Sequence, residues 1–283
     1  MRRAFVTVTT IGFLLGACAS ENPTVGGGAS GPSHSASSCS PSTMHLFTPG
    51  QLTVATASPA YNPWFRHNDP SNGDGYESAV TYAVADQLGF STDQVHWVVQ
   101  PFGKTFAPGP KDYDFAIEQI SITPERAQAV TFSEGYYDDQ QALLAIKGTP
   151  IANATTIAEL KPYKFGAEIG TTSLAFTSQQ IQPSQQPAVF DTTAAAISAL
   201  ENGQIDGMVL DLPTASYTQY AIKNGTLVGK FAPAGEQFGM AFEKGNPLVT
   251  CVNQAIESLK SNGTLDQLQK RWLANYASVP LIS

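Results

Sequence analysis

Strand-like and helix-like segments alternate along this chain in two successive runs, and this alternation limits the possible folds more than any other feature. Short stretches rich in β-branched residues predict strands, while apolar residues at helical spacing that end in glycine predict helices. In the first run these are the strands 52–56, 95–99, 113–120 and 141–146, a helix over 75–89 and a helix beginning at Thr123-Pro124. This order is typical of the α/β class with mostly parallel sheets.

The second run repeats the pattern from residue 164. It comprises the strands 164–170, 205–211, TLVGKF and QFGMAF, helices over TTSLAFTSQQ, 191–203 and 213–225, and two closing helices, NPLVTCVNQAIESLKSNG and TLDQLQKRWLAN. The folded part begins near Leu46 and is long enough for two domains of ordinary size.

The first residues carry the pattern of an export signal. Met1 to Arg3 is positively charged, residues 4–15 are mainly apolar, and LLGAC follows. LLGAC resembles a bacterial lipobox, which implies a signal peptide over 1–17 and lipidation of Cys18; a plain signal peptide with an incidental cysteine is the alternative. Residues 18–45 are rich in Gly, Ser and Pro and predict a flexible linker. We therefore expect an extracytoplasmic domain tethered to the cell membrane.

Composition argues against several classes of function. The net charge is −8, only 13% of residues are charged and no basic run occurs, so nucleic acid is not expected as a partner. The four histidines lack metal-ligand spacing, and no GxSxG, P-loop or GxGxxG motif is present, so we expect no metal, no cofactor and no catalytic residue. In an oxidising compartment Cys39 and Cys251 most simply form a disulfide; the alternative is two free thiols.

Three places suit a zwitterionic ligand. Ser121 follows a strand, and Arg126 lies in the first turn of a helix, where the helix dipole disfavours a cation unless an anion binds beside it. The GTTS turn at 170–173 also opens a helix after a strand. Asp211 ends a strong strand at the sheet edge where α/β folds bind ligands. The alternatives are a surface ion pair of Arg126 with Glu125 or Glu134, and a helix-capping role for Asp211.

Five blocks of sequence, in order from Leu52 to Leu273, resemble the bacterial extracellular solute-binding proteins of family 3. They are GQLTVAT…AYNPWF, QISITPERAQAVTFSEGYY, GTTS, AISALENGQIDGMVLDLPTASY and NGTLDQLQKRWL. The resemblance implies a two-lobed, periplasmic-binding-protein-like α/β fold that closes about two crossover strands. QALLAI and FGMAF occupy the places of those strands. The first lobe would then span 46–142 plus 240–283, and the second 143–239.

The same resemblance implies roles for individual residues. The ligand carboxylate is assigned to Arg126, Ser121, Thr171, Thr172 and Ser173, and the ligand ammonium to Asp211 and Gln119. Contacts with the ligand side chain are assigned to Tyr61, Trp64, Phe102, Glu118 and Glu168. Ordinary core packing is the alternative for the aromatic residues, and an internal ion pair with Lys104 or Lys111 is the alternative for Glu118.

The implied function is an amino-acid-binding lipoprotein, expected as a monomer, that delivers its ligand to an ABC permease and its ATPase. Glu118 and Glu168 favour a polar ligand, basic or amide. One alternative is a dehydratase-like enzyme on the same scaffold that acts on a small carboxylic acid. Asp211 disfavours this alternative, because such an enzyme needs no acceptor for an ammonium group. The other alternative is a ligand-sensing lipoprotein.

Overall fold

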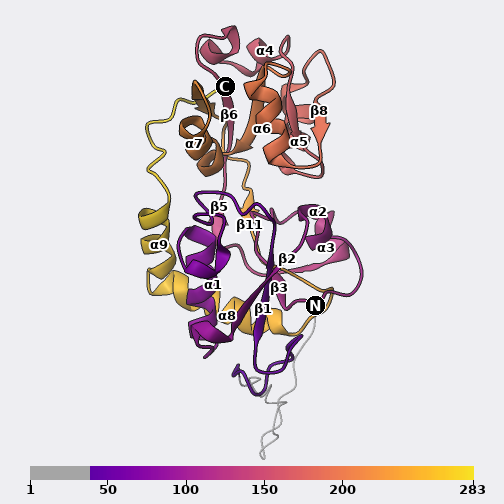
Figure 1. Cartoon of the computed structure of the whole chain (residues 1–283), viewed down its shortest axis with the longest axis vertical. Coiled ribbons are helices and arrows are strands. Elements are labelled where there is room, and N and C mark those ends of the chain that lie inside the picture. Colours follow the sequence, from indigo (N-terminus) through magenta and orange to yellow (C-terminus); the bar gives the residue numbers. More distant parts are fainter. Residues whose placement is uncertain (1–38) are drawn as a thin grey trace, which may run out of the picture. The chain divides into compact units, whose positions relative to one another are not determined.

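The computed structural model describes residues 39–283 (Figure 1). The predicted signal peptide 1–17, the lipidation of Cys18 and the linker as far as residue 38 lie outside the described residues. Two groups of elements follow, which we call the first and second lobes. No described helix is long and apolar enough to cross a membrane.

The first lobe is built on a five-stranded sheet in the order β2-β1-β3-β12-β4. Strand β1 is parallel to its neighbours β2 and β3, whereas β12 is antiparallel to β3 and β4. The strands are β1 Leu52–Thr56, β2 Val95–Val99, β3 Phe115–Ala116, β4 Thr131–Phe132 and β12 Ala241–Phe242. Every residue of β1 is buried, as its unbroken apolar and β-branched sequence predicts.

Three helices pack together beside this sheet: α1 Tyr76–Gln87, α8 Leu248–Ser261 and α9 Thr264–Trp272 (Figure 1). Their buried residues join the apolar side chains of β1 and β3 in one core. Short helices near the second lobe are α2 Phe102–Thr105 and α3 Arg126–Ala129, and 3-10 turns lie at Pro70–Asn72 and Thr92–Gln94. The predicted helix after Thr123-Pro124 is therefore only four residues long.

Cys39 and Cys251 form a disulfide, with their Cα atoms 5.5 Å apart. Next to Cys39, residues 40–44 form a turn in which Thr43 and Met44 donate backbone hydrogen bonds to the carbonyl of Ser40. The ordered fold thus begins about seven residues earlier than Leu46, and the end of the predicted linker is corrected accordingly.

The second lobe has a three-stranded sheet in the order β10-β6-β9, with β6 antiparallel to both neighbours, and a parallel pair β7–β8. The expectation of mostly parallel sheets is wrong for this lobe, because β6 enters from the first lobe and is not part of a local strand-helix-strand unit. The strands are β6 Gln141–Ile146, β7 Gly166–Glu168, β8 Ala188–Phe190, β9 Gly207–Asp211 and β10 Gly225–Lys230.

The helices of this lobe are α4 Ile157–Leu160, α5 Thr172–Phe176, α6 Thr193–Glu201 and α7 Leu212–Ala221, with a 3-10 turn at Pro150–Asn153 and a π-helical turn at Thr177–Ile181. The sequence places Asp191 at the start of α6, but the capping side chain is Thr192, which accepts a hydrogen bond from the amide of Ala195. A hydroxyl one residue further along therefore takes the capping role.

Two crossover segments, 139–140 and 231–236, join the lobes. They flank a small antiparallel pair formed by β5 Tyr137–Asp138 and β11 Gln237–Phe238. The predicted crossovers QALLAI and FGMAF lie just beyond them: QALLAI is the central strand β6 of the second lobe, and FGMAF ends in β12 of the first.

The last residues of the chain contact the second lobe, although helices α8 and α9 before them belong to the first (Figure 1). Ile282 lies in the second lobe's core, and the amide of Ile157 donates to the carbonyl of Ser283. The amide of Lys230 likewise donates to the carbonyl of Pro280. We propose that the predicted division holds except at its edges: all of β6 and residues 279–283 belong to the second lobe, and β11 belongs to the first.

Candidate functional site

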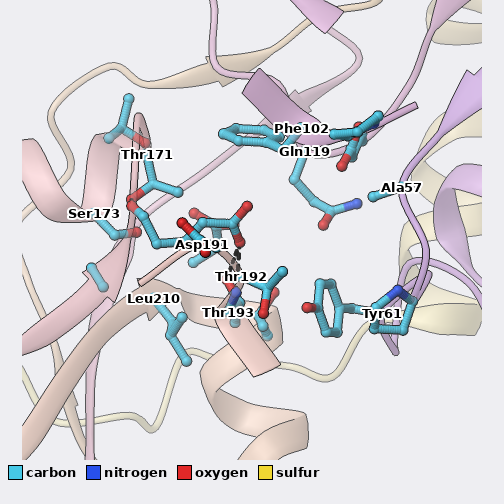
Figure 2. A pocket seen from close by; sticks show the side chains of 18 of the residues that line it. Ala57, Tyr61, Phe102, Gln119, Thr171, Ser173, Asp191, Thr192, Thr193 and Leu210 are labelled. Atoms are coloured by element: carbon cyan, nitrogen blue, oxygen red, sulfur yellow. Dashed lines mark hydrogen bonds between the residues drawn. The ribbon is translucent and has the colours of Figure 1, made fainter. Parts of the chain in front are cut away.

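A cavity of about 270 Å³ lies between the lobes and is lined by residues of both. The first lobe contributes Tyr61, Phe102, Glu118 and Gln119, and the second contributes Glu168, residues 171–173 and Asp211. Figure 2 shows Tyr61, Phe102 and Gln119 on one side of this space and Thr171, Ser173 and Thr192 on the other. Most of the residues that the sequence assigns to a ligand therefore lie around one space.

The lining of this cavity is acidic. It includes four carboxylates, Glu118, Glu168, Asp191 and Asp211, and no lysine, arginine or histidine among the residues that line it. Carboxylates placed close together in a partly desolvated space repel one another, and a bound cation removes that repulsion. The lining therefore carries carboxylates that no cation of the lining compensates.

Glu118 is the carboxylate least compensated by the protein. Its side chain is 6% exposed, and its Oε2 atom has no hydrogen-bond partner within the described residues. Burial, with Glu77 and Glu168 nearby, raises the pKa of Glu118 well above its ordinary value. Neither of the two ion pairs in the described residues includes Glu118, so the pair considered with Lys104 or Lys111 is not formed. Lys111 Nζ instead donates to the carbonyls of Lys104 and Ala107.

Behind Glu118 lies a second buried carboxylate that sequence reasoning missed. Glu77 of α1 is fully buried and accepts hydrogen bonds from the Tyr136 hydroxyl and from both the backbone amide, at 2.7 Å, and the side-chain amide of Gln119. Burial raises the pKa of Glu77 to about 7. Gln119, with φ of 50°, is thus held by Glu77, and its predicted ammonium contact remains a proposal. The sequence signal that could have identified Glu77 is an acidic residue next to Tyr76 on the buried face of α1.

Glu168 and Tyr61 meet the first turn of α6. Glu168 Oε2 accepts bonds from the amide and the hydroxyl of Thr193 at 2.7 and 2.8 Å, and the Tyr61 hydroxyl accepts from the Ala194 amide at 3.2 Å. Both contacts place acceptors at a helix N-terminus, where the dipole favours them. Burial raises the pKa of Tyr61 to about 12 and also raises that of Glu168. The Tyr61 contact joins the two lobes.

Arg126 is buried and also joins the lobes. Its guanidinium donates to the carbonyl of Ser121 at 2.9 Å and to the carbonyl of Gly170, in the second lobe, at 2.8 Å. It lies over the rings of Phe106 and Phe102, 4.3 and 5.4 Å from their centroids. Neither of the two ion pairs in the described part of the chain includes Arg126, so the alternative pair with Glu125 or Glu134 is wrong. Burial lowers the pKa of Arg126 to about 10.

The hydroxyl residues assigned to the ligand carboxylate gather near this arginine. Ser121 Oγ lies 3.2 Å from Thr172 Oγ1 across the lobes and donates to Glu236 Oε1 at 2.6 Å. The hydroxyl of Thr171 accepts from the amide of Leu174 and so caps α5, while Ser173 Oγ donates to Gln141 Oε1. Thr171, Thr172 and Ser173 line the cavity, so the N-terminal turn of α5 faces it, and the carboxylate contact assigned to this turn stays a prediction.

Asp211 ends β9, and its side chain does not cap α7. Instead its Oδ1 accepts from Gln141 Nε2 at 3.2 Å. Burial, and then the nearby carboxylate of Glu236, raises the pKa of Asp211 to about 7. Glu236 and Gln141 were not identified from the sequence, because both contribute through the crossover segments and neither belongs to a recognisable local motif.

Three assigned site residues, Ser121, Arg126 and Trp64, do not line the cavity. For Trp64 the packing also contradicts the assignment. Its side chain is fully buried and packs edge-on against Tyr137 and Phe238 in the first lobe. Its indole nitrogen donates to the hydroxyl of Thr214 at 2.8 Å. Trp64 is absent from the cavity lining, so it belongs to the core, and only the Thr214 hydroxyl that it binds reaches the cavity.

Comparison with known proteins matches residues 52–275 to the model of the bacterial extracellular solute-binding proteins, family 3. A glutamine-binding protein of an ABC transporter from Bacillus subtilis is 32% identical over 74% of this chain and 77% of its own. An ABC transporter arginine-binding protein from Escherichia coli is 30% identical over 57% of this chain and 67% of its own. A solved structure of an ancestral arginine-binding protein bound to glutamine matches 80% of this chain and 98% of its own, with 27% identity and a TM-score of 0.68.

Proposed function

Because this chain belongs to the bacterial extracellular solute-binding proteins of family 3, we propose that it is the amino-acid receptor of an ABC importer and that its ligand is a basic amino acid. One observation carries the choice of ligand: Glu118, Glu168, Asp191 and Asp211 line the cavity without a compensating cation among its lining residues. A neutral amide side chain leaves those charges unopposed, whereas a guanidinium or ammonium group neutralises one of them.

The ligand backbone is expected to lie where Ser121 and Arg126 of the first lobe meet the N-terminal turn of α5 in the second. The α-carboxylate meets the Ser121 and Thr172 hydroxyls and the amides of α5, while Arg126 provides positive charge behind them. The α-ammonium meets Asp211. The side chain extends between Tyr61 and Phe102 towards Glu118, whose Oε2 atom lacks a hydrogen-bond partner in the described part of the chain.

Binding on this arrangement works by a shift between open and closed forms. Tyr61 and Phe102 belong to one lobe and residues 171–173 and Asp211 to the other, so a ligand contacts both groups only when the lobes are closed. The closed form is then delivered to a membrane permease that is driven by an ATPase. We further propose that the protein acts as a monomer, is lipid-anchored through Cys18 at the outer face of the cell membrane, and catalyses no reaction.

The dehydratase alternative is not favoured, since the relatives described above are named as binding proteins of transporters. The ligand-sensing alternative has no specific observation in its support.

The test is isothermal titration calorimetry of the purified soluble domain against arginine, lysine, histidine and glutamine. We expect one site per chain, with arginine or lysine at least about tenfold tighter than glutamine, which corresponds to roughly 1.4 kcal/mol. Glutamine binding more tightly than every basic amino acid would show that the acidic lining does not select the ligand. Absence of binding across all four would remove the proposed receptor function.

A further inference from the structure

Gln119 is the cavity residue whose backbone conformation requires an explanation. Its φ of 50° is left-handed, which a side chain disfavours because its Cβ atom crowds the following carbonyl oxygen. Glycine adopts the same conformation without this penalty. Gln119 lines the cavity, and Figure 2 shows its side chain pointing into that space. A glutamine at a position that suits glycine indicates that its amide has a use there.

Glu77 of α1 holds Gln119 at two points. Its Oε1 atom accepts from the Gln119 backbone amide at 2.7 Å, and its Oε2 atom accepts from Gln119 Nε2. The Tyr136 hydroxyl also donates to Oε1, and the Tyr136 carbonyl in turn accepts from the Tyr76 hydroxyl at 2.8 Å. Glu77 is fully buried and does not line the cavity, so any effect that it has on a ligand passes through Gln119.

These contacts determine which end of the Gln119 amide is available to a ligand. An ionised carboxylate only accepts hydrogen bonds, so the end of the amide that faces Glu77 has to be the NH₂ group. The other end, Oε1, accepts no hydrogen bond within residues 39–283. Gln119 therefore offers the cavity an unused acceptor, and the charge of Glu77 fixes it in that orientation.

We propose that Glu77 is a positioning residue of the binding site, which turns the Gln119 amide so that Oε1 accepts a hydrogen bond from the ammonium group of the ligand. This inference rests on the proposed function, since it assumes an amino-acid ligand. Asp211, the charged acceptor proposed for the same group, lines the cavity together with Gln119. An ammonium group has three hydrogens to donate, so it can use both acceptors at once.

The charge of Glu77 is necessary for this role, and Glu77→Gln removes only the charge. The new carbonyl oxygen still accepts from the Gln119 backbone amide and the Tyr136 hydroxyl. The new NH₂ group needs an acceptor, and a half-turn of the Gln119 amide supplies one. Gln119 Nε2 then faces the cavity and presents a donor to the ligand ammonium. We therefore expect weaker ligand binding in a protein that keeps these internal hydrogen bonds.

The stability of the empty protein is not expected to fall with the affinity. Burial raises the pKa of Glu77 to about 7, above its ordinary value of 4.5, so the stability that this group contributes at low pH is lost at pH 8. Glu77→Gln carries no buried charge, and its melting temperature at pH 8 is expected to equal or exceed that of the wild type. A purely structural carboxylate would show no dependence of its effect on the Gln119 side chain.

Calorimetric titrations of arginine, lysine, histidine and glutamine at pH 8 test the inference. Glu77→Gln is expected to weaken every amino acid that the wild type binds by about tenfold or more, since all share the ammonium group. Gln119→Gly keeps the left-handed turn and removes the acceptor, so the same loss is expected. The double variant is expected to bind no more weakly than Gln119→Gly alone, because Glu77 acts through that side chain.

Asp114→Asn is the matched control for the loss of a buried carboxylate. Asp114 is buried in the same lobe and accepts from the backbone amides of Phe47 and Thr53, and none of these three residues lines the cavity. Its substitution is expected to leave the affinity for amino acids unchanged, whatever it does to the melting temperature. A loss of affinity equal to that of Glu77→Gln would show that any buried carboxylate of the lobe has this effect, and would overturn the inference.

Nuclear magnetic resonance of the ¹⁵N-labelled, ligand-free protein observes the amide itself. The Gln119 side-chain NH₂ signal is identified by its absence from Gln119→Gly. We expect its hydrogens to exchange slowly with water in the wild type, where Nε2 donates to the buried Glu77, and faster in Glu77→Gln, where Nε2 faces the cavity. Unchanged exchange would show that the charge of Glu77 does not set the orientation of the amide.

The titrations separate this inference from the proposed function. A wild type that binds none of the four amino acids would remove the receptor function and this inference with it. A wild type that binds, with Glu77→Gln binding equally well, would remove only the positioning role. A further loss of affinity in the double variant would also contradict it. Should Glu77→Gln not fold, Gln119→Gly replaces it, and unchanged affinity there would overturn the inference equally.

Discussion

Glu118→Gln provides the sharpest test of the cavity, because it is expected to weaken ligand binding and stabilise the empty protein together. The substitution keeps the shape of the side chain and removes its charge. A charge-assisted bond from a basic ligand to the Glu118 carboxylate contributes about 1.5–3 kcal/mol. Its loss therefore weakens arginine or lysine binding by roughly ten- to hundredfold. Glutamine binding changes far less, since an amide donor bonds equally well to the new carbonyl.

The stability of the empty protein is expected to move in the opposite direction, with a defined pH dependence. Because burial raises the pKa of Glu118 in the folded state above its ordinary value of 4.5, the folded protein holds this proton more tightly than the unfolded chain. The contribution of Glu118 to the free energy of unfolding is complete below about pH 4.5 and is lost as the pH rises towards its pKa in the folded protein. The Glu118→Gln variant cannot lose stability in this way, so the difference between its melting temperature and that of the wild type grows as the pH rises above 4.5.

Differential scanning calorimetry between pH 4.5 and 8, paired with ligand titrations at pH 7.5, measures both effects. An advantage of about 1–2 kcal/mol at the upper end corresponds to a rise of roughly 2–8 °C in melting temperature. Glu125→Gln is the control, since Glu125 is exposed and lies outside the cavity. A variant that binds arginine as tightly as wild type and melts at the same temperature at every pH would refute the assignment of Glu118 as the uncompensated acceptor.

Three further substitutions test other contacts. Arg126→Ala is expected to weaken amino-acid binding roughly ten- to hundredfold by calorimetry, through loss of its charge and of its bond to Gly170 between the lobes; unchanged affinity would remove it from the carboxylate site. Asp211→Asn is expected to reduce the affinity for every amino acid alike, because it removes the acceptor for the shared ammonium group; a loss confined to basic ligands would instead assign Asp211 to the side chain. Cys251→Ser is expected to lower unfolding free energy by about 2–5 kcal/mol in denaturant titrations, since it removes the cross-link to Cys39; equal stability of the oxidised wild type and the variant would contradict this expectation.

The sequence predicts the fold best where local pattern and burial agree. Residues 52–56, 95–99 and 141–146 are strands with the predicted bounds. Apolar and β-branched runs suit the buried strands β1 and β6, and the same residue types favour β2, although β2 is only partly buried. The strand expected over 113–120 is only two residues long. The Asp114 side chain accepts hydrogen bonds from the amides of Phe47 and Thr53 just before the strand. Gln119 adopts a left-handed backbone conformation after it, so the strand is confined to residues between the two. Neither event leaves a local signal in the sequence.

Some residues of the candidate site were also predicted from the sequence, and others were missed. Asp211 was predicted to lie in it because it ends an apolar strand, and Glu168 because of the resemblance to the family, and both line the cavity. Glu77 and Glu236 were missed, since one lies within a helix and the other in a segment without regular structure. Their contacts depend on Gln119 and Gln141, each more than 40 residues away along the chain. Such partners become visible only when the lobes are assembled.

The disulfide also determines how the domain bears mechanical load. A force applied to the chain ahead of Cys39 reaches the fold by two covalent routes, along the backbone towards β1 and through Cys251 into the first turn of α8. Cys251 lies in the packed core of the first lobe, where α8 contacts α1 and α9, so part of the load passes to these helices and not to β1 alone. With this linkage a pull on the chain ahead of Cys39 does not have to unzip β1, and the cavity between the lobes lies outside the path of the load.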